Sequence, residues 1–212
     1  MDRYDMTVTE ITDISKTKIK VCIDNGETFA LYKGELNKFQ IKTGEAITDE
    51  LYQKIMGEIL LKRAKLRCMN LLKSRDYTEH QIRTKLEQGL YPDRIIDEAV
   101  AYMVSFGYLD DIRYARSYIH CKESTRSRKQ IETELLRKGV PREEICTAYE
   151  QCVQEDDLTD EEEIIIKLLA KKRYDSQNTT YEERQKVIAS LYRKGFSLDK
   201  IYKAVEKKEC QY

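Results

Sequence analysis

Two adjacent carboxylates near the centre of the chain are the residues whose chemistry has to be considered first. Asp110 and Asp111 belong to the stretch FGYLDDIRYARSYI, residues 106–119. Metal-dependent nucleases use grouped carboxylates to hold divalent cations. Asp is also among the best residues for capping the start of a helix, and a second acid favours the positive end of the helix dipole. Capping accounts for both residues, so we expect no metal-dependent catalysis here.

The other groups with possible chemistry also have simpler explanations. His120 and Cys121 could suggest a nucleophile pair, but neighbours in a helix point about 100° apart. The segment EDDLTDEEE, residues 155–163, lacks the glycine and the ligand spacing of an EF-hand, and we interpret it as an acidic linker. Walker, G-x-G-x-x-G, G-x-S-x-G and H-E-x-x-H motifs are absent. We therefore expect no catalytic residue, no cofactor and no metal ligand.

Composition points to a water-soluble, helix-rich protein. The chain of 212 residues has 38 basic and 38 acidic residues, and charged residues make up 36%. No stretch is apolar and long enough for a signal peptide or a membrane span. The six cysteines form no C-x-x-C pair, which is typical of reduced thiols inside the cell. We expect a cytoplasmic monomer that has no membrane partner.

The first 47 residues differ from the rest of the chain. Short runs of β-branched residues occur between residues 6 and 45, and Asn25–Gly26 stands between two of them. Asn-Gly is a strong signal for a β-hairpin turn. We predict a small N-terminal β element, residues 1–47, with two or three strands that lean on the helix after Thr48.

The remainder of the chain repeats itself at intervals of about 50 residues, a spacing typical of helical arrays. Each copy has a glycine expected to end a helix in the left-handed conformation, and each has an S/T-x-x-E/Q capping box before it. The glycines are Gly89, Gly139 and Gly195, and the boxes begin at Thr78, Ser127 and Thr180. Each copy therefore predicts three helices: a leading helix, a capped middle helix and a third helix.

These patterns predict a mainly α protein. We expect an elongated tandem array of three three-helix repeats, at residues 48–110, 111–157 and 158–212, with a small N-terminal β-hairpin element. In this arrangement Gly107 ends the last helix of the first repeat. Phe106, Tyr108 and Leu109 are predicted to pack in the joint that follows.

Positive charge gathers on the leading and middle helices. Residues 112–140 carry eight basic residues and three acidic ones, whereas residues 141–163 carry one basic residue and ten acidic ones. The basic helices could be ordinary solvated faces, or they could form a broken basic stripe along one side of the array. For the second interpretation, the predicted contact residues are Arg113, Tyr114, Arg116, Arg126, Arg128, Lys129, Lys138 and Lys194.

The chain resembles the RecX family of bacterial regulatory proteins. The resemblance is carried by the segment GYLDDIRYARSYI, residues 107–119, together with the three repeats. In that family a similar aromatic-Gly-Tyr-Leu-Asp-Asp segment leads into a helix of Arg, Ala and aromatic residues. The RKG turns at residues 137–139 and 193–195 fit the family too. The resemblance covers residues 50–210, and the net charge of zero departs from the family's often basic character.

The resemblance implies a non-enzymatic regulator of the RecA recombinase. Such a protein binds the RecA filament on single-stranded DNA, inhibits its ATPase, strand exchange and growth, and so modulates recombination and DNA repair. Two alternatives from other classes are a stand-alone single-stranded nucleic-acid-binding protein and a nuclease. Steep salt dependence on bare DNA would favour the first alternative, and metal-dependent turnover would favour the second.

Overall fold

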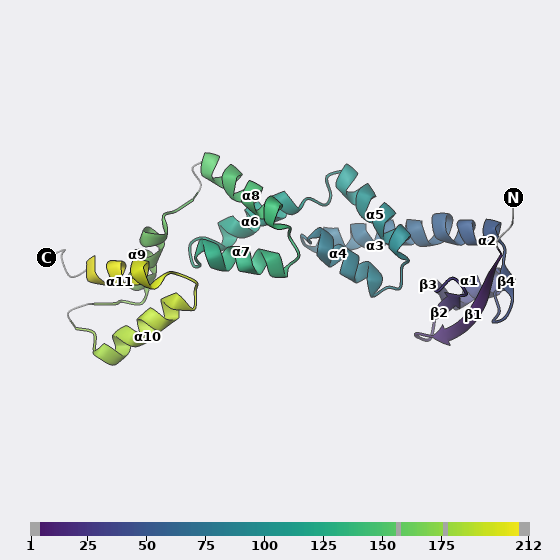
Figure 1. Cartoon of the computed structure of the whole chain (residues 1–212), viewed down its shortest axis with the longest axis horizontal. Coiled ribbons are helices and arrows are strands. Elements are labelled where there is room, and N and C mark those ends of the chain that lie inside the picture. Colours follow the sequence, from purple (N-terminus) through teal and green to yellow (C-terminus); the bar gives the residue numbers. More distant parts are fainter. Residues whose placement is uncertain (1–4, 156–157, 176–177, 208–212) are drawn as a thin grey trace. The chain divides into compact units, whose positions relative to one another are not determined.

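The computed structural model describes residues 5–155, 158–175 and 178–207 of the chain. It divides into two compact units, Met1–Asp110 and Asp111–Tyr212. The predicted mainly α fold is confirmed, because three helical repeats follow a small N-terminal sheet (Figure 1). No helix in these described ranges is long and apolar enough to cross a membrane.

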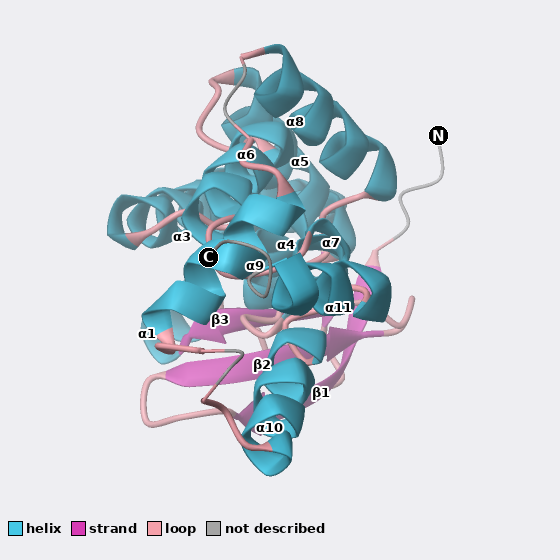
Figure 2. Ribbon diagram, turned by 90° about the vertical axis from the view of Figure 1, so that its left-hand side faces the viewer, coloured by secondary structure: helices cyan, strands magenta, loops and turns pink. Residues whose placement is uncertain are grey.

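The N-terminal element is an antiparallel sheet of four strands, in the order β3-β2-β1-β4 (magenta in Figure 2). Its strands are β1 (Met6–Asp13), β2 (Lys18–Ile23), β3 (Thr28–Tyr32) and β4 (Ala46–Ile47), and helix α1 (Lys33–Lys38) follows β3. Gly26 forms the predicted turn between β2 and β3, with φ of +86°. The short strand β4 was not predicted, because two residues are too few to show an alternating pattern.

The first repeat packs against this sheet in one hydrophobic core. Its elements are α2 (Asp49–Lys54), the π-helical segment η1 (Ile55–Leu60), α3 (Leu61–Ser74), α4 (Glu79–Glu87) and α5 (Asp93–Ser105). Val21 and Phe29 of the sheet share that core with Ile82 and Val100 of the helices. The sheet therefore has the apolar support that so small an element needs.

The second and third repeats each have a core of their own. Their helices are α6 (Asp111–Lys122), α7 (Arg128–Arg137), α8 (Arg142–Gln154), α9 (Glu161–Lys171), α10 (Tyr181–Tyr192) and α11 (Leu198–Lys207). Ile145 and Ala148 are buried in the second core, and Ile201 and Ala204 are buried in the third. In both repeats the Ile and the Ala lie six and nine residues after the glycine, Gly139 or Gly195, so the repeat period marks the face that the third helix buries.

The helix caps agree with the sequence in most details. Thr78 and Thr180 form complete capping boxes with Gln81 and Glu183. Ser127 accepts a hydrogen bond from the Gln130 N–H at 3.2 Å, but the Gln130 side chain does not return to the cap. It donates instead to Glu134, four residues further along α7. This box is therefore only half formed.

One of the three predicted glycine caps is wrong. Gly139 and Gly195 have φ of +86° and +90°, as expected for a left-handed cap. In the first repeat the left-handed residue is Leu90, with φ of +58°, and not Gly89. Gly89 is needed for space, because a Cβ there would lie 2.8 Å from Cε2 of Tyr91. The first copy has one residue more at this point, since Ile96 follows Gly89 by seven residues and Ile201 follows Gly195 by six, and the cap lies one position later.

The joint after α5 is only partly as predicted. Gly107 has φ of +67°, and the Tyr108 N–H donates to the Met103 carbonyl at 2.9 Å, which closes the helix end. Leu109 is buried, but Phe106 and Tyr108 are 61% and 53% exposed. The prediction that both rings pack in the joint is therefore wrong. The capped turn directs Leu109 inward and leaves the two rings outside, where they stack on each other.

The second and third repeats meet through backbone contacts. The Ser127 N–H donates to the Lys194 carbonyl at 3.1 Å, and Lys194 Nζ donates to the Thr125 carbonyl at 3.3 Å. A Cβ on Gly195 would collide with Ser127 Oγ and lie 2.8 Å from Gln130 Cβ. The turn of the third repeat therefore rests directly on the start of α7.

Candidate functional site

Helix α6 places two tyrosines and a lysine on one face. Tyr114, Tyr118 and Lys122 are four residues apart in sequence, so their side chains lie one above another along the helix. The rings of Tyr114 and Tyr118 stack with centroids 6.4 Å apart, and Lys122 Nζ lies 5.9 Å from the Tyr118 centroid. The three side chains are half-buried, so the face remains accessible to a partner.

Tyr118 connects this face to α7. Its hydroxyl donates to Glu134 Oε2 at 2.7 Å, and Arg126 Nη1 lies 2.8 Å from Glu134 Oε1. Lys138 Nζ lies 5.2 Å from the Tyr118 centroid, in the range of a cation–π contact. We call this group the Tyr118 cluster; its members are Tyr114, Tyr118, Lys122, Arg126, Glu134 and Lys138.

The electrostatics of the Tyr118 cluster favour a positively charged, aromatic surface. Burial and the hydrogen bond to Glu134 raise the pKa of Tyr118 to about 12, so it remains a neutral donor. Burial alone would raise the pKa of Glu134, but its hydrogen bonds from Tyr118 and Gln130 and the charge of Arg126 lower it. The cluster therefore combines three cations with one ionised carboxylate. Such a surface suits an anionic or aromatic partner group.

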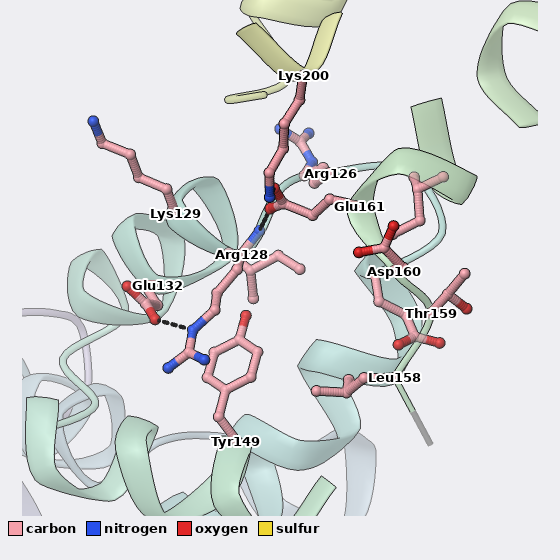
Figure 3. Close-up of a pocket in the computed structure, with 13 residues that line it drawn as sticks. Arg126, Arg128, Lys129, Glu132, Tyr149, Leu158, Thr159, Asp160, Glu161 and Lys200 are labelled. Carbon is pink, nitrogen blue, oxygen red and sulfur yellow. Dashed lines mark hydrogen bonds and ion pairs between the residues drawn. The ribbon is translucent and has the colours of Figure 1, made fainter. Parts of the chain in front are cut away.

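A second group of predicted residues lines a pocket of about 590 Å³ between the second and third repeats (Figure 3). Arg128 Nε lies 2.7 Å from Glu132 Oε1, and its guanidinium carbon lies 4.3 Å from the Tyr149 centroid. Lys129 is exposed and makes no ion pair within the described residues. Arg126 lines the same pocket, so it joins the pocket to the Tyr118 cluster.

The other predicted contact residues lie elsewhere. Arg116 forms an ion pair with Glu155 and a hydrogen bond of 3.4 Å to Gln151, so it holds the end of α8. Lys194 lies in the joint between the second and third repeats, and Arg113 is exposed on α6. The structure thus brings Tyr114, Arg126 and Lys138 into one cluster, with Arg128 and Lys129 beside it, and it does not bring in the other three.

Sequence reasoning missed the residue at the centre of the cluster. Tyr118 is not among the predicted contact residues, although its i, i+4 relation to Tyr114 and Lys122 was available as a signal in the sequence. The contact between Cys152 Sγ and His120 Nε2, at 3.6 Å, carried no such signal, because the two residues are 32 positions apart. In the described part of the chain, no group of three or more His, Cys, Asp or Glu side chains could hold a metal ion.

Family comparisons match each of the three repeats separately. Residues 64–103 match the first three-helix domain of RecX, residues 110–148 the second, and residues 160–205 the third. A relative from Caldanaerobacter subterraneus subsp. tengcongensis, called regulatory protein RecX, is 31% identical over 94% of this chain and 98% of its own length. A regulatory protein RecX from Leuconostoc mesenteroides subsp. mesenteroides is 28% identical over 90% of this chain and 72% of its own.

Solved structures show the same fold. The crystal structure of a regulatory protein RecX has a TM-score of 0.58 at 23% identity, and the match covers 95% of this chain and 99% of that one. RecX from Lactobacillus salivarius has a TM-score of 0.57 at 22% identity, over 71% of this chain and 97% of that one. At these identities the likeness concerns the fold alone.

Proposed function

The chain belongs to the RecX family of regulatory proteins, and from this premise we propose that it regulates the RecA recombinase. In this proposal it binds the RecA filament on single-stranded DNA and inhibits its ATPase, its strand exchange and its growth. It acts in the cytoplasm, without catalytic activity or a cofactor of its own, and so modulates recombination and DNA repair.

The observation that carries the proposal is the match over nearly the full length of a regulatory protein, 94% of this chain and 98% of the relative. Each of the three repeats also matches its own RecX domain. The Tyr118 cluster is the surface that fits the role best, since a filament of protein and DNA offers phosphates and carboxylates to cations held at fixed positions.

The proposal is tested by the ATPase activity of RecA on single-stranded DNA, titrated with the purified protein. Inhibition at well below one protein per recombinase monomer is the expected result. No inhibition, with the chain still bound to the DNA itself, would favour the alternative of a stand-alone nucleic-acid-binding protein.

The surface is tested in the same titration. Replacing Lys129 and Lys138 by Glu should raise the concentration for half-inhibition by about tenfold, because Lys138 belongs to the cluster and Lys129 lies beside it. Lys171→Glu combined with Lys186→Glu, two exposed changes on α9 and α10, is the control for charge. Equal effects of the two variants would contradict the assignment of the surface to the second repeat.

A further inference from the structure

Three buried side-chain polar atoms in the described residues have no hydrogen-bond partner: Arg116 Nε, Glu123 Oε2 and the Tyr149 hydroxyl. Glu123 and Tyr149 both line the pocket between the second and third repeats. Tyr149 is only 3% exposed, and its hydroxyl points from α8 into that pocket (Figure 3). A buried hydroxyl without a partner costs about 1–3 kcal/mol. The pocket therefore presents an unused donor to any acceptor that enters it.

The same pocket contains the start of α7. The Ser127 hydroxyl accepts from the Gln130 N–H. The Arg128 N–H donates instead, at 3.0 Å, to Oε1 of Glu161 on α9. Backbone N–H groups at a helix start, with the positive end of the helix dipole behind them, favour a bound anion. The carboxylate of Glu161 thus occupies the position that a phosphate would take at this helix.

A lysine already pairs with the Glu161 carboxylate at that position. Lys200 Nζ lies 2.7 Å from Glu161 Oε2, and the Lys129 side chain is exposed at the rim. Of the other acids that line the pocket, Glu132 pairs with Arg128 and Asp160 caps α9 by accepting from the Glu162 N–H, whereas Glu123 keeps one buried oxygen, Oε2, without a partner. An anion that replaced Glu161 would find Lys200 as its counter-charge.

A second carboxylate of the acidic segment acts in the same way. Glu155, at the end of α8, pairs with Arg116 of α6. Glu163, by contrast, pairs with Lys167 on its own helix at 3.6 Å and does not reach the second repeat. The acidic segment, residues 155–163, therefore contacts the second repeat at two defined points, the Glu155–Arg116 ion pair and the hydrogen bond from the Arg128 N–H to Glu161, and Glu163 provides an internal control.

We propose that this pocket binds a backbone phosphate of single-stranded nucleic acid, and that Glu161 is an internal competitor for that phosphate. The phosphodiester accepts hydrogen bonds from the Arg128 N–H and the Tyr149 hydroxyl once Glu161 has moved away. The acidic segment thereby holds the affinity of the second repeat for nucleic acid low. This rests on the proposed function, because the filament supplies the single strand.

The test compares Glu161→Gln with Glu163→Gln in the full chain. Both changes remove one charge from the first turn of α9, but only Glu161→Gln weakens the contact with the start of α7, because a neutral amide oxygen is a poorer acceptor for the Arg128 N–H than a carboxylate. Fluorescence anisotropy with a labelled single-stranded oligodeoxythymidine should show roughly three- to tenfold tighter binding for Glu161→Gln. Glu163→Gln should stay within about twofold of the wild type.

The second part of the binding test uses the substitution Tyr149→Phe. Added to Glu161→Gln, it should abolish the gain, because the hydroxyl is the donor that the phosphate recruits. Thermal unfolding of each variant checks that the fold is kept. Equal tightening by both glutamine variants, or a gain that survives Tyr149→Phe, would overturn the proposal.

Inorganic phosphate and ATP distinguish a small ligand from a nucleic acid. If Glu161→Gln bound phosphate or ATP more tightly than the wild type does, but not the oligonucleotide, the assignment would also be overturned. The recombinase is absent from these measurements, so their failure leaves the proposed function standing. A failed ATPase titration would likewise leave this site intact.

Discussion

At the scale of single residues, Glu134 decides how the Tyr118 cluster is held together. Its carboxylate accepts from the Tyr118 hydroxyl and from Gln130 Nε2, and it pairs with Arg126. One acid thus orients an aromatic ring and a cation that come from different segments. Hydrogen bonds to an ionised acceptor are stronger than those between neutral groups, so this one residue keeps the surface in a defined arrangement.

Replacing Glu134 by Gln should lower the free energy of unfolding by about 1 kcal/mol at neutral pH. The folded state lowers the pKa of Glu134 below its ordinary value of 4.5, so its contribution is present above that value. The contribution is lost as the pH falls through the folded-state pKa. Denaturant unfolding at a series of pH values should therefore show the difference between variant and wild type vanishing in acid.

Glu150→Gln is the control, because Glu150 is exposed on α8. It should change the stability little at any pH. A deficit of Glu134→Gln that persisted unchanged in acid would mean that packing of the side chain, and not its charge, stabilises the cluster.

At the scale of elements, a helix start and a helix end form the joint between the second and third repeats. Ser127 caps α7, and its own backbone N–H donates to the carbonyl of Lys194, in the turn that ends α10. Gly195 follows in the left-handed conformation, against the capping hydroxyl. The residues that end one helix thus also set the contact between neighbouring repeats, which is how stacked repeats gain stability.

Gly195→Ala should destabilise the protein more than Gly107→Ala. Both glycines have positive φ, so each alanine costs about 1 kcal/mol in backbone strain. A Cβ at Gly107 meets nothing within 4 Å, whereas one at Gly195 collides with Ser127 and Gln130. We expect an additional loss of about 1–3 kcal/mol for Gly195→Ala, measured by denaturant unfolding.

Equal losses for the two alanine variants would contradict the close contact at Gly195. Hydrogen exchange adds a local check, since the amides at the start of α7 should lose protection in Gly195→Ala and keep it in Gly107→Ala.

At the scale of the whole molecule, three separate hydrophobic cores stabilise the fold. One core joins the sheet to the first repeat, and the second and third repeats each have another. No residue belongs to two of these cores within the described ranges. Stability in such arrays is close to a sum of local terms and nearest-neighbour contacts.

Leu191→Ala should therefore act locally. Leu191 is fully buried in the third core, and its truncation should cost that repeat about 2–5 kcal/mol. Hydrogen exchange should rise across α9–α11 and stay unchanged across α3–α5. Leu135→Ala, at an equally buried position of α7, should raise exchange in the second repeat instead. A rise through the whole chain in either variant would show a single cooperative unit.

The sequence by itself determined the three-helix repeats, most of their caps and the Asn25–Gly26 turn, because these depend on local backbone preferences and on helical periodicity. Only the tertiary structure decided which residues meet across elements. It placed Phe106 and Tyr108 outside, assigned the left-handed cap to Leu90, and made Tyr118 the centre of a cluster drawn from two helices. It also brought Glu161 to the start of α7, 33 positions away. Such contacts follow from packing over long sequence distances, which no local pattern records.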